Sequence, residues 1–134
     1  VNDDLPIYHT NVMMSLGQET VFICSESIKD QKDIKRIHKL FEISERKIIE
    51  LSMAQMNQFA GNVLEVENTK GQSHLIMSKK AYQSLEAPQI QSISKSSKII
   101  SIPLDTIEKY GGGSARCMIA EIFLQKLLHS SLSI

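Results

Sequence analysis

Residues 57–65 read Asn-Gln-Phe-Ala-Gly-Asn-Val-Leu-Glu and join a short helix to a strand. Apolar side chains recur at helical spacing through residues 52–59, and Gly61 is typical of the turn that follows a helix. The β-branched and apolar residues of 63–67 predict a strand, as do those of residues 47–51. The stretch therefore predicts a strand, a helix and a second strand in close succession.

The segments on either side of this stretch repeat one order of elements, which is strand, strand, helix, strand. In the first unit we expect a hairpin over residues 8–24, an amphipathic helix over 30–41 and the strand over 47–51. In the second we expect strands over 63–67 and 74–77, helical pieces over 78–94 broken at Pro88, and a strand over 98–102. The glycine-rich segment that follows begins a third unit. Because such units must stack on neighbours to bury both faces of their sheets, the pattern predicts an α/β repeat fold of about two and a half ββαβ units.

The composition is that of an ordinary globular protein and excludes several partner classes. The chain has 134 residues, of which 42% are hydrophobic and 22% charged, and its 15 Lys and Arg balance its 15 Asp and Glu. With no net field, neither nucleic acid nor a membrane surface is expected as a partner, which leaves a small molecule or a protein. The first residues, 1–4, do not resemble a signal peptide, and we expect a cytoplasmic protein whose two cysteines remain reduced.

Near the carboxyl end the chain reads Gly-Gly-Gly-Ser-Ala-Arg-Cys-Met over residues 111–118. Three residues without Cβ allow positive φ and let several backbone N–H groups point toward one place. Arg116 beside Cys117 would favour the thiolate if it faced the sulfur. The segment therefore predicts a reactive thiol, with a small buried cysteine at the entry of a strand as the alternative.

A histidine lies in a polar setting near the amino end, where residues 8–14 read Tyr-His-Thr-Asn-Val-Met-Met. We expect His9 at the start of a β-run and treat it as a candidate catalytic residue, with a structural histidine as the alternative. The other three histidines fit structural or surface roles, namely His38 in a helix, His74 at a strand edge and His129 in a serine-rich tail.

The segment around His9, residues 57–65 and residues 111–123 resemble, in this order, the amidinotransferase and arginine deiminase superfamily, whose members are called penteins. The resemblance is closest to the bacterial citrulline-utilisation hydrolases. It implies a five-bladed α/β propeller of ββαβ modules around a central site, and substrates that carry a guanidino or ureido group. Residues 1–134 are then expected to form a single domain, the carboxyl-terminal half of such a propeller.

The resemblance implies that Cys117 is the nucleophile that attacks the guanidino or ureido carbon. It also implies that His9 protonates the leaving group and then activates water. The amides of Gly113 and Ser114 are candidates for holding the developing charge. We expect neither a metal ion nor a cofactor.

Two asparagines are further candidates for substrate binding. Arginine deiminases have a carboxylate two residues after the histidine, whereas this chain has Asn11, and an amide suits a neutral ureido group better. Asn62 either lines the site or serves as a turn residue after Gly61. Lys79 and Lys80 are assigned to a solvated helix start, with contact to a substrate carboxylate as the alternative.

The three acidic residues Glu65, Glu108 and Glu121 lie in family-like segments, but the sequence gives them no role beyond packing, pairing or orientation. The carboxylates that the family uses to clamp a guanidinium and that come from an amino-terminal half have no counterpart here. The expected function is a cysteine-dependent hydrolase. The alternatives are an amidinotransferase and a non-catalytic truncated pentein that acts in binding or assembly. In each case we expect a homo-oligomer or pairing with a missing amino-terminal half.

Overall fold

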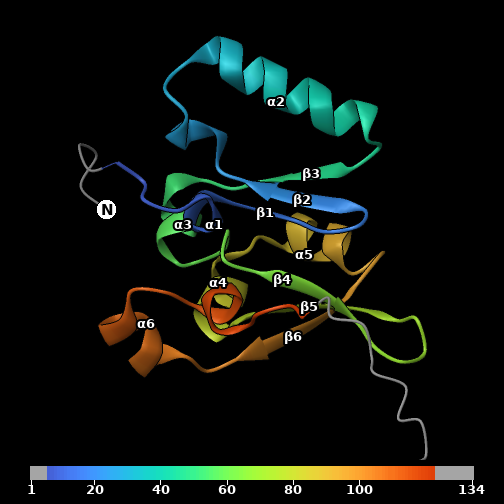
Figure 1. Cartoon of the computed structure of the whole chain (residues 1–134), viewed down its shortest axis with the longest axis vertical. Coiled ribbons are helices and arrows are strands. Elements are labelled where there is room, and N and C mark those ends of the chain that lie inside the picture. The colour runs from blue at the N-terminus through green and yellow to red at the C-terminus, as the bar shows by residue number, and fades with distance from the viewer. Residues whose placement is uncertain (1–5, 123–134) are drawn as a thin grey trace, which may run out of the picture.

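The computed structural model describes residues 6–122, which contain two three-stranded sheets of the same design (Figure 1). The strands of the first sheet are β1 (Met14–Leu16), β2 (Thr20–Ile23) and β3 (Lys47–Glu50), and those of the second are β4 (Leu64–Glu67), β5 (Ser73–Ser78) and β6 (Lys98–Ile102). In each sheet the first two strands pair antiparallel and the last two pair parallel. The repeated unit expected from the sequence is therefore confirmed.

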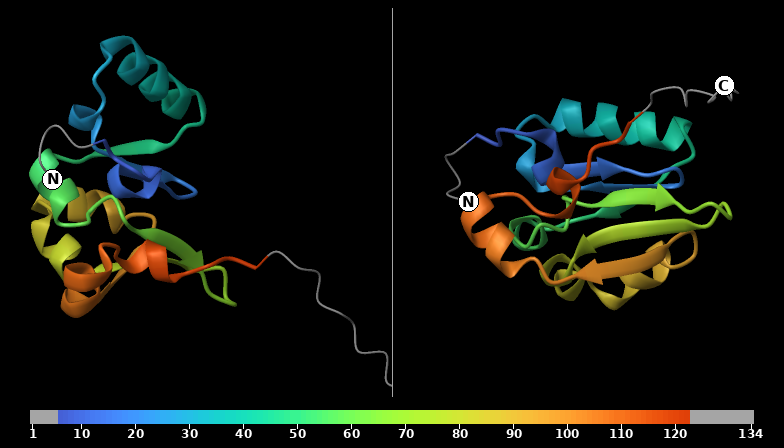
Figure 2. Two further views of the ribbon diagram at one scale, coloured as in Figure 1. Left: turned by 60° about the vertical axis from the view of Figure 1, so that its left-hand side comes forward. Right: turned by 60° about the horizontal axis from the view of Figure 1, so that its bottom comes forward.

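Helices connect the strands of each sheet and join the two sheets. The helical elements are α1 (Thr10–Met13), η1 (Ser25–Ser27), α2 (Gln31–Ile43), α3 (Met53–Asn57), α4 (Lys79–Ser84), α5 (Ala87–Ile93), α6 (Asp105–Gly111) and η2 (Ala115–Met118). Helix α2 crosses between the parallel strands of the first unit, and α4 and α5 do so in the second. Figure 2 shows α2 on the side of the first sheet that faces away from the second sheet.

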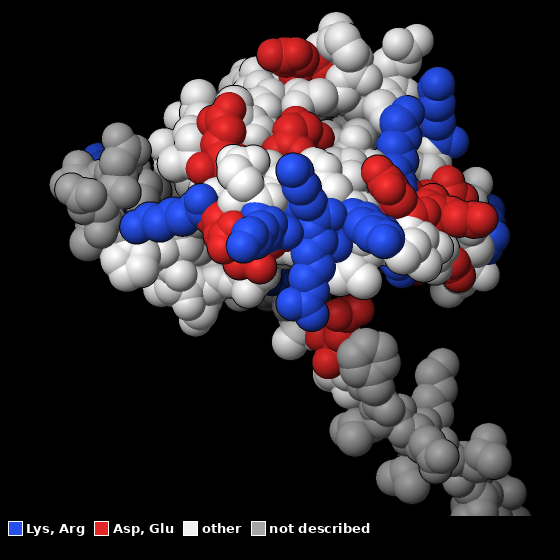
Figure 3. Space-filling view, turned by 90° about the horizontal axis from the view of Figure 1, so that it is seen from above, with Lys and Arg blue, Asp and Glu red and all other residues white. Residues whose placement is uncertain are grey.

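Helix α2 begins where the sequence predicts, because Asp30 caps it. The Asp30 carboxylate accepts a hydrogen bond from the backbone N–H of Lys32 at 2.7 Å, which satisfies one of the free donors of the first turn. The apolar side of the helix packs against the first sheet, but none of its residues is fully buried. Seen from the α2 side, Lys and Arg side chains gather across the middle of the face, and Asp and Glu side chains lie around them (Figure 3). This face therefore carries both signs of charge.

Helix α3 links the two units through one buried glutamine. Ser52 and Gln55 form a capping box, in which each side chain bonds to the backbone N–H of the other. The Gln55 side-chain amide also donates to the Ser84 carbonyl at 2.9 Å and to the Gln89 side-chain oxygen at 2.7 Å. The first turn of α3 is thus hydrogen-bonded to α4 and α5 of the second unit.

A single hydrophobic cluster spans both units. Its buried members come from both sheets and from the helices between them, and they are Phe22, Cys24, Ile49, Leu51, Met56, Ala60, Val63, Leu75, Met77, Ala81, Leu85 and Ile93. Because the cluster is continuous, removing either unit would expose the apolar face of the other.

The two units also touch where backbone and side chains approach closely. A Cβ on Gly61 would lie 2.7 Å from the Val12 carbonyl oxygen, so only glycine allows this approach. The Glu65 carboxylate accepts hydrogen bonds from the Gln18 backbone N–H at 2.8 Å and from the Ser97 hydroxyl at 2.9 Å. Glu65 therefore connects β4 to the turn between β1 and β2.

The sequence-based expectation was wrong in two segments, residues 10–13 and residues 105–118. Residues 10–13 form the helical turn α1, so the hairpin is confined to β1 and β2, and His9 precedes a helical turn instead of a β-run. Helix α6 was not expected, and residues 115–118 form the 3-10 turn η2 where a strand was expected. A third unit therefore does not begin within residues 111–118.

One internal boundary also differs. Pro88 lies in the first turn of α5, where a residue without a free N–H is well tolerated, so it does not break an existing helix. The predictions that concern residues 1–4, Phe123 and His129 lie outside the described residues. Within residues 6–122, no helix combines the length and apolar character needed to cross a membrane.

Candidate active site

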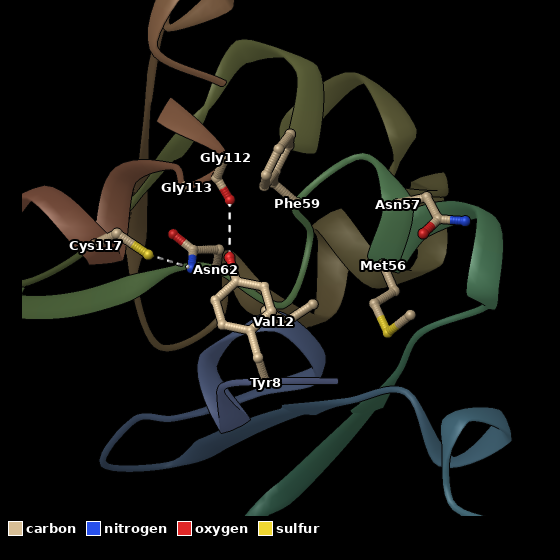
Figure 4. Close-up of a pocket in the computed structure, with 9 residues that line it drawn as sticks. All are labelled: Tyr8, Val12, Met56, Asn57, Phe59, Asn62, Gly112, Gly113 and Cys117. Atoms are coloured by element: carbon tan, nitrogen blue, oxygen red, sulfur yellow. Dashed lines mark hydrogen bonds between the residues drawn. The ribbon is translucent and has the colours of Figure 1, made fainter. Parts of the chain in front are cut away.

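Three segments that are far apart in the sequence meet around one cavity of about 210 Å³. They are the amino-terminal segment before β1, the end of α3 with the turn that follows it, and the glycine-rich segment after α6 (Figure 4). The lining residues are Tyr8, Val12, Met56, Asn57, Phe59, Asn62, Gly112, Gly113 and Cys117. All three segments that were singled out from the sequence, those around His9, Asn62 and Cys117, contribute residues to this lining.

The glycines after α6 give the chain the shape that delivers Cys117. Gly112 ends the helix with a φ of 67°, a left-handed conformation that favours glycine. A Cβ on Gly113 would lie 3.0 Å from the Cys117 Cβ and 3.1 Å from its sulfur. Gly113 is therefore required because the Cys117 side chain folds back against it.

Cys117 is a free and exposed thiol with amide groups around its sulfur. The Asn62 side-chain amide donates to Sγ at 3.1 Å, and the Asn11 side-chain amide donates to it at 3.6 Å. The exposure of Cys117 shows that the alternative of a buried cysteine was wrong, and its reactivity stays a prediction. Arg116 does not contact the sulfur, because its guanidinium donates to the Ile119 carbonyl at 3.1 Å and pairs with Glu121.

Asn62 is 2% exposed and is the polar centre of this arrangement. Its Nδ2 donates to the Asn11 carbonyl at 3.0 Å as well as to Cys117, and its Oδ1 accepts from the Arg116 backbone N–H at 3.0 Å. Among the described residues, the non-glycine residues with positive φ are Glu45 and Phe59, so Asn62 is not the left-handed turn residue. The left-handed alternative for Asn62 was wrong, but its backbone N–H does close a turn by donating to the Phe59 carbonyl at 2.9 Å.

His9 lies beside the cavity without contacting the sulfur. It precedes α1, its side chain is exposed, and its ring centroid is 4.7 Å from that of Tyr8. Tyr8 in turn donates a hydrogen bond to the Gly112 carbonyl at 3.1 Å. Within residues 6–122, no hydrogen bond joins the His9 ring to Cys117. The structure thus brings Asn11, Asn62 and Gly113 to the sulfur, but not His9.

Ser114 does not line the cavity, and its side chain bonds to the buried carboxylate of an ion pair that the sequence did not reveal. Its hydroxyl donates to Glu108 Oε1 at 2.7 Å, and Lys80 Nζ lies 3.4 Å from Glu108 Oε2. The Glu108 side chain is only 1% exposed. Lys80 is therefore paired with a buried carboxylate instead of being a freely solvated lysine. The position of Glu108 on the buried side of α6 could have indicated this ion pair, but the helix itself was not predicted.

Two other histidines have structural surroundings, as expected. His38 Nε2 lies 2.8 Å from the Ser25 hydroxyl and 3.6 Å from Glu50, which accepts from the same hydroxyl. Both partners therefore meet the same ring nitrogen, whereas a catalytic triad needs the serine and the acid on different nitrogens. His74, near the start of the central strand β5, bonds through Nδ1 to the Gln72 carbonyl. No group of three or more His, Cys, Asp or Glu in the described residues is arranged to hold a metal ion.

The comparisons with known proteins agree with this fold and give it a family. Residues 2–124 match the family model described as N,N dimethylarginine dimethylhydrolase, eukaryotic. The chain belongs to this family. Its membership of the pentein superfamily is thereby confirmed.

This member of the dimethylarginine dimethylhydrolase family also resembles a solved structure. The apo structure of ArgZ, an arginine dihydrolase from the ornithine-ammonia cycle in cyanobacteria, matches with a TM-score of 0.64 and 18% sequence identity. The match covers 87% of this chain and 17% of the ArgZ chain, so it confirms a partial pentein α/β fold. A comparison with curated proteins finds no match.

Proposed function

We propose that this chain carries the nucleophile of a hydrolase that acts on the guanidino carbon of arginine-like substrates. The observation that carries the proposal is the exposed Cys117 thiol, which opens into a cavity and accepts a hydrogen bond from the buried Asn62 amide. The family supports the same chemistry, because its name describes hydrolysis of dimethylarginine. A methylated arginine or arginine itself is therefore the first substrate to test.

In the proposed reaction, the Cys117 thiolate attacks the central guanidino carbon and forms a C–S bond, while His9 carries the proton that the thiol has lost. The C–N bond to the leaving amine then breaks, and His9 gives that amine its proton. Water next loses a proton to His9 and adds to the same carbon, after which the C–S bond breaks and a ureido product leaves. Because His9 is exposed and unbonded to Cys117 in the described structure, the proposal requires its imidazole to turn from Tyr8 toward the cavity when substrate is present.

Gly113 supports the proposal more directly than Ser114 does. Gly113 lines the cavity and lies against Cys117, so its backbone N–H is the better candidate for stabilising developing charge. Ser114 is fully buried and its hydroxyl is already bound to Glu108, so we assign it a supporting role beneath the loop.

A second candidate substrate class is favoured by one observation. The Asn11 amide lies 3.6 Å from the Cys117 sulfur, at the position where arginine deiminases are expected to have a carboxylate. An amide offers no negative charge to a guanidinium but can bond a neutral ureido oxygen. We therefore also propose a preference for citrulline-like ureido compounds over arginine. An amidinotransferase would use the same sulfur chemistry with an amine in place of water.

The cavity residues carry no carboxylate within the described part of the chain, although a guanidinium is best held by bidentate acceptors. We propose that residues 1–134 form the carboxyl-terminal half of a pentein propeller. A further protein segment or a second copy would supply these acids, and the assembly would work in the cytoplasm, where its thiols stay reduced. If no such segment exists, the non-catalytic alternative gains support.

The test is an assay of the 134-residue chain and of any longer protein that contains it. Each is incubated with dimethylarginine, arginine and citrulline, and the release of amine or ammonia is measured together with any mass adduct on Cys117. We expect turnover or an adduct that disappears in Cys117→Ala and persists in Cys24→Ala, the matched control for a buried thiol. Absence of both products and adducts from the longer protein would contradict the enzymatic proposal.

The ureido preference is tested in the same assay with Asn11→Asp. We expect the ratio of citrulline to arginine turnover to fall by about tenfold, because the new carboxylate attracts a guanidinium and repels a carbonyl dipole. An unchanged ratio would contradict the assigned role of Asn11 but would leave the guanidino hydrolase intact.

A further inference from the structure

The cavity contains one side chain that touches every segment of the site. The Asn62 amide group makes three hydrogen bonds, to the Asn11 carbonyl, to the Arg116 backbone N–H and to the Cys117 sulfur. These partners lie 51, 54 and 55 residues from it in the sequence. A single planar group therefore fixes the amino-terminal segment and the nucleophile loop relative to each other.

The bonding capacity of this amide leaves little freedom. A primary amide has two N–H donors, and in Asn62 one partner of Nδ2 is a backbone carbonyl and the other is the sulfur. Its oxygen is held by a backbone N–H at 3.0 Å, which prevents the amide from exchanging its nitrogen and oxygen. Two hydrogen bonds from the Asn62 side chain to backbone groups therefore fix the direction of the N–H that points at Cys117.

Burial makes this orientation rigid. Asn62 is 2% exposed, so water does not compete for its donors, and an unpaired buried N–H would be costly. The sulfur is thus the partner that the second donor needs. Asn11, by contrast, is only partly buried and lies farther from the sulfur, at 3.6 Å.

We infer that Asn62 is a positioning residue for the nucleophile, which holds the Cys117 sulfur toward the cavity through an N–H···S hydrogen bond. The inference rests on the proposed function, in which that sulfur attacks the substrate. It adds that the reactivity of the sulfur depends on a residue more than fifty positions away, and that this dependence exists before substrate binds.

The first test is spectroscopic and needs no substituted Asn62. Nuclear magnetic resonance of the chain labelled with ¹⁵N resolves the side-chain amide protons of the asparagines. We expect one Asn62 amide proton to move upfield in Cys117→Ala, while the Asn68 amide, which bonds to Gln72, stays in place. An Asn62 amide proton that does not respond to loss of the sulfur would overturn the inference.

The second test measures the rate at which iodoacetamide alkylates Cys117, followed by peptide mass analysis. Asn62→Asp keeps the shape of the side chain but replaces the donors with a carboxylate that repels a thiolate, so we expect the rate to fall about fivefold or more. Asn68→Asp is the matched control, because the Asn68 amide bonds to Gln72 and not to the sulfur, and it should leave the rate unchanged. Thermal unfolding of each variant establishes that it is folded.

The outcomes separate the inference from the proposed function. A folded Asn62→Asp chain that is alkylated at the wild-type rate overturns the positioning role. If that variant does not fold, the Asn62 proton shift in Cys117→Ala decides. Neither measurement requires turnover, so a chain without hydrolase activity can still support the role of Asn62, and an active chain can still refute it.

Discussion

At the scale of single residues, Gly113 and Asn62 determine the environment of Cys117 more than its charged neighbours do. Gly113 leaves room for the sulfur, and Asn62 donates a hydrogen bond to it. Arg116, the cation next to Cys117 in the sequence, turns toward Ile119 and Glu121. Proximity in sequence was therefore a poor guide to which group meets the sulfur.

Gly113→Ala tests the steric part of this arrangement. The new Cβ would lie 3.0 Å from the Cys117 Cβ, so the cysteine must shift or rotate. We expect a loss of about 1–3 kcal/mol in the free energy of unfolding, together with a changed alkylation rate at Cys117. Chemical denaturation and thiol labelling measure the two effects.

Gly111→Ala is the control for that substitution. A Cβ on Gly111 meets nothing closer than an Ile107 side-chain atom at 3.8 Å, which is ordinary contact. We expect unchanged or slightly higher stability, because alanine favours the helical conformation. Equal losses in both variants would show that glycine flexibility, and not the space beside Cys117, is what the loop requires.

At the scale of elements, most of the strands and helices could be predicted from the sequence. The strands have β-branched or apolar runs, and α2 has both a cap and helical spacing, so their local signals agree. Apart from the short turns α1 and η1, the predicted order of strands and helices was correct through β6. The sequence therefore predicts well those elements that begin with a capping residue or show a clear helical or strand periodicity.

The elements nearest the site were the ones that the sequence did not determine. The apolar run of residues 12–14 is too short to distinguish a strand from a helical turn, and its backbone conformation depends on contacts with Gly61 and Asn62. Helix α6 is only seven residues long and runs into three glycines, which are a strong turn signal. In both places contacts distant in sequence outweigh local preference.

Helix α6 is anchored by the Glu108 carboxylate, and Ser114→Ala tests this anchor. The substitution leaves Glu108 Oε1 buried without the 2.7 Å bond from the Ser114 hydroxyl. We expect a loss of about 1–3 kcal/mol in the free energy of unfolding, measured by chemical denaturation.

The matched pair for this anchor is Lys80→Met and Lys79→Met on α4. Lys80 is paired with the buried Glu108, whereas Lys79 is exposed. We expect Lys80→Met to destabilise the chain and Lys79→Met to leave its stability nearly unchanged. If both lysines can be replaced without loss, the carboxylate does not depend on its ion pair.

At the scale of the whole molecule, one core holds both units together, and Cys24 lies inside it. Burial raises the pKa of the Cys24 thiol, and the neighbouring carboxylates Glu26 and Glu50 raise it further. The neutral thiol is therefore favoured in the folded state. The unfolded chain ionises this thiol at about pH 8.5, where the folded chain still keeps its proton.

This shift predicts a loss of stability in alkaline solution. The contribution of Cys24 is fully present below about pH 8.5 and declines as the pH rises from there through the folded pKa, because unfolding then releases a proton. Thermal unfolding between neutral and alkaline pH measures the decline. Cys24→Ala should flatten this part of the profile, whereas Cys117→Ala should not, and equal slopes in all three chains would exclude Cys24 as the cause.

The hydrogen bond between Tyr8 and Gly112 joins residues that are 104 positions apart, and the bond from Asn62 to Cys117 spans 55. Such contacts form late, because a long loop must close before either is made. When β1 to β3 have left the ribosome, the nascent chain therefore still lacks Asn62 and Cys117. Only after η2 has emerged can Asn62 and Cys117 meet. Among the described residues that line the cavity, Cys117 is thus the last to be synthesised, after Asn11 and Asn62, which orient its sulfur.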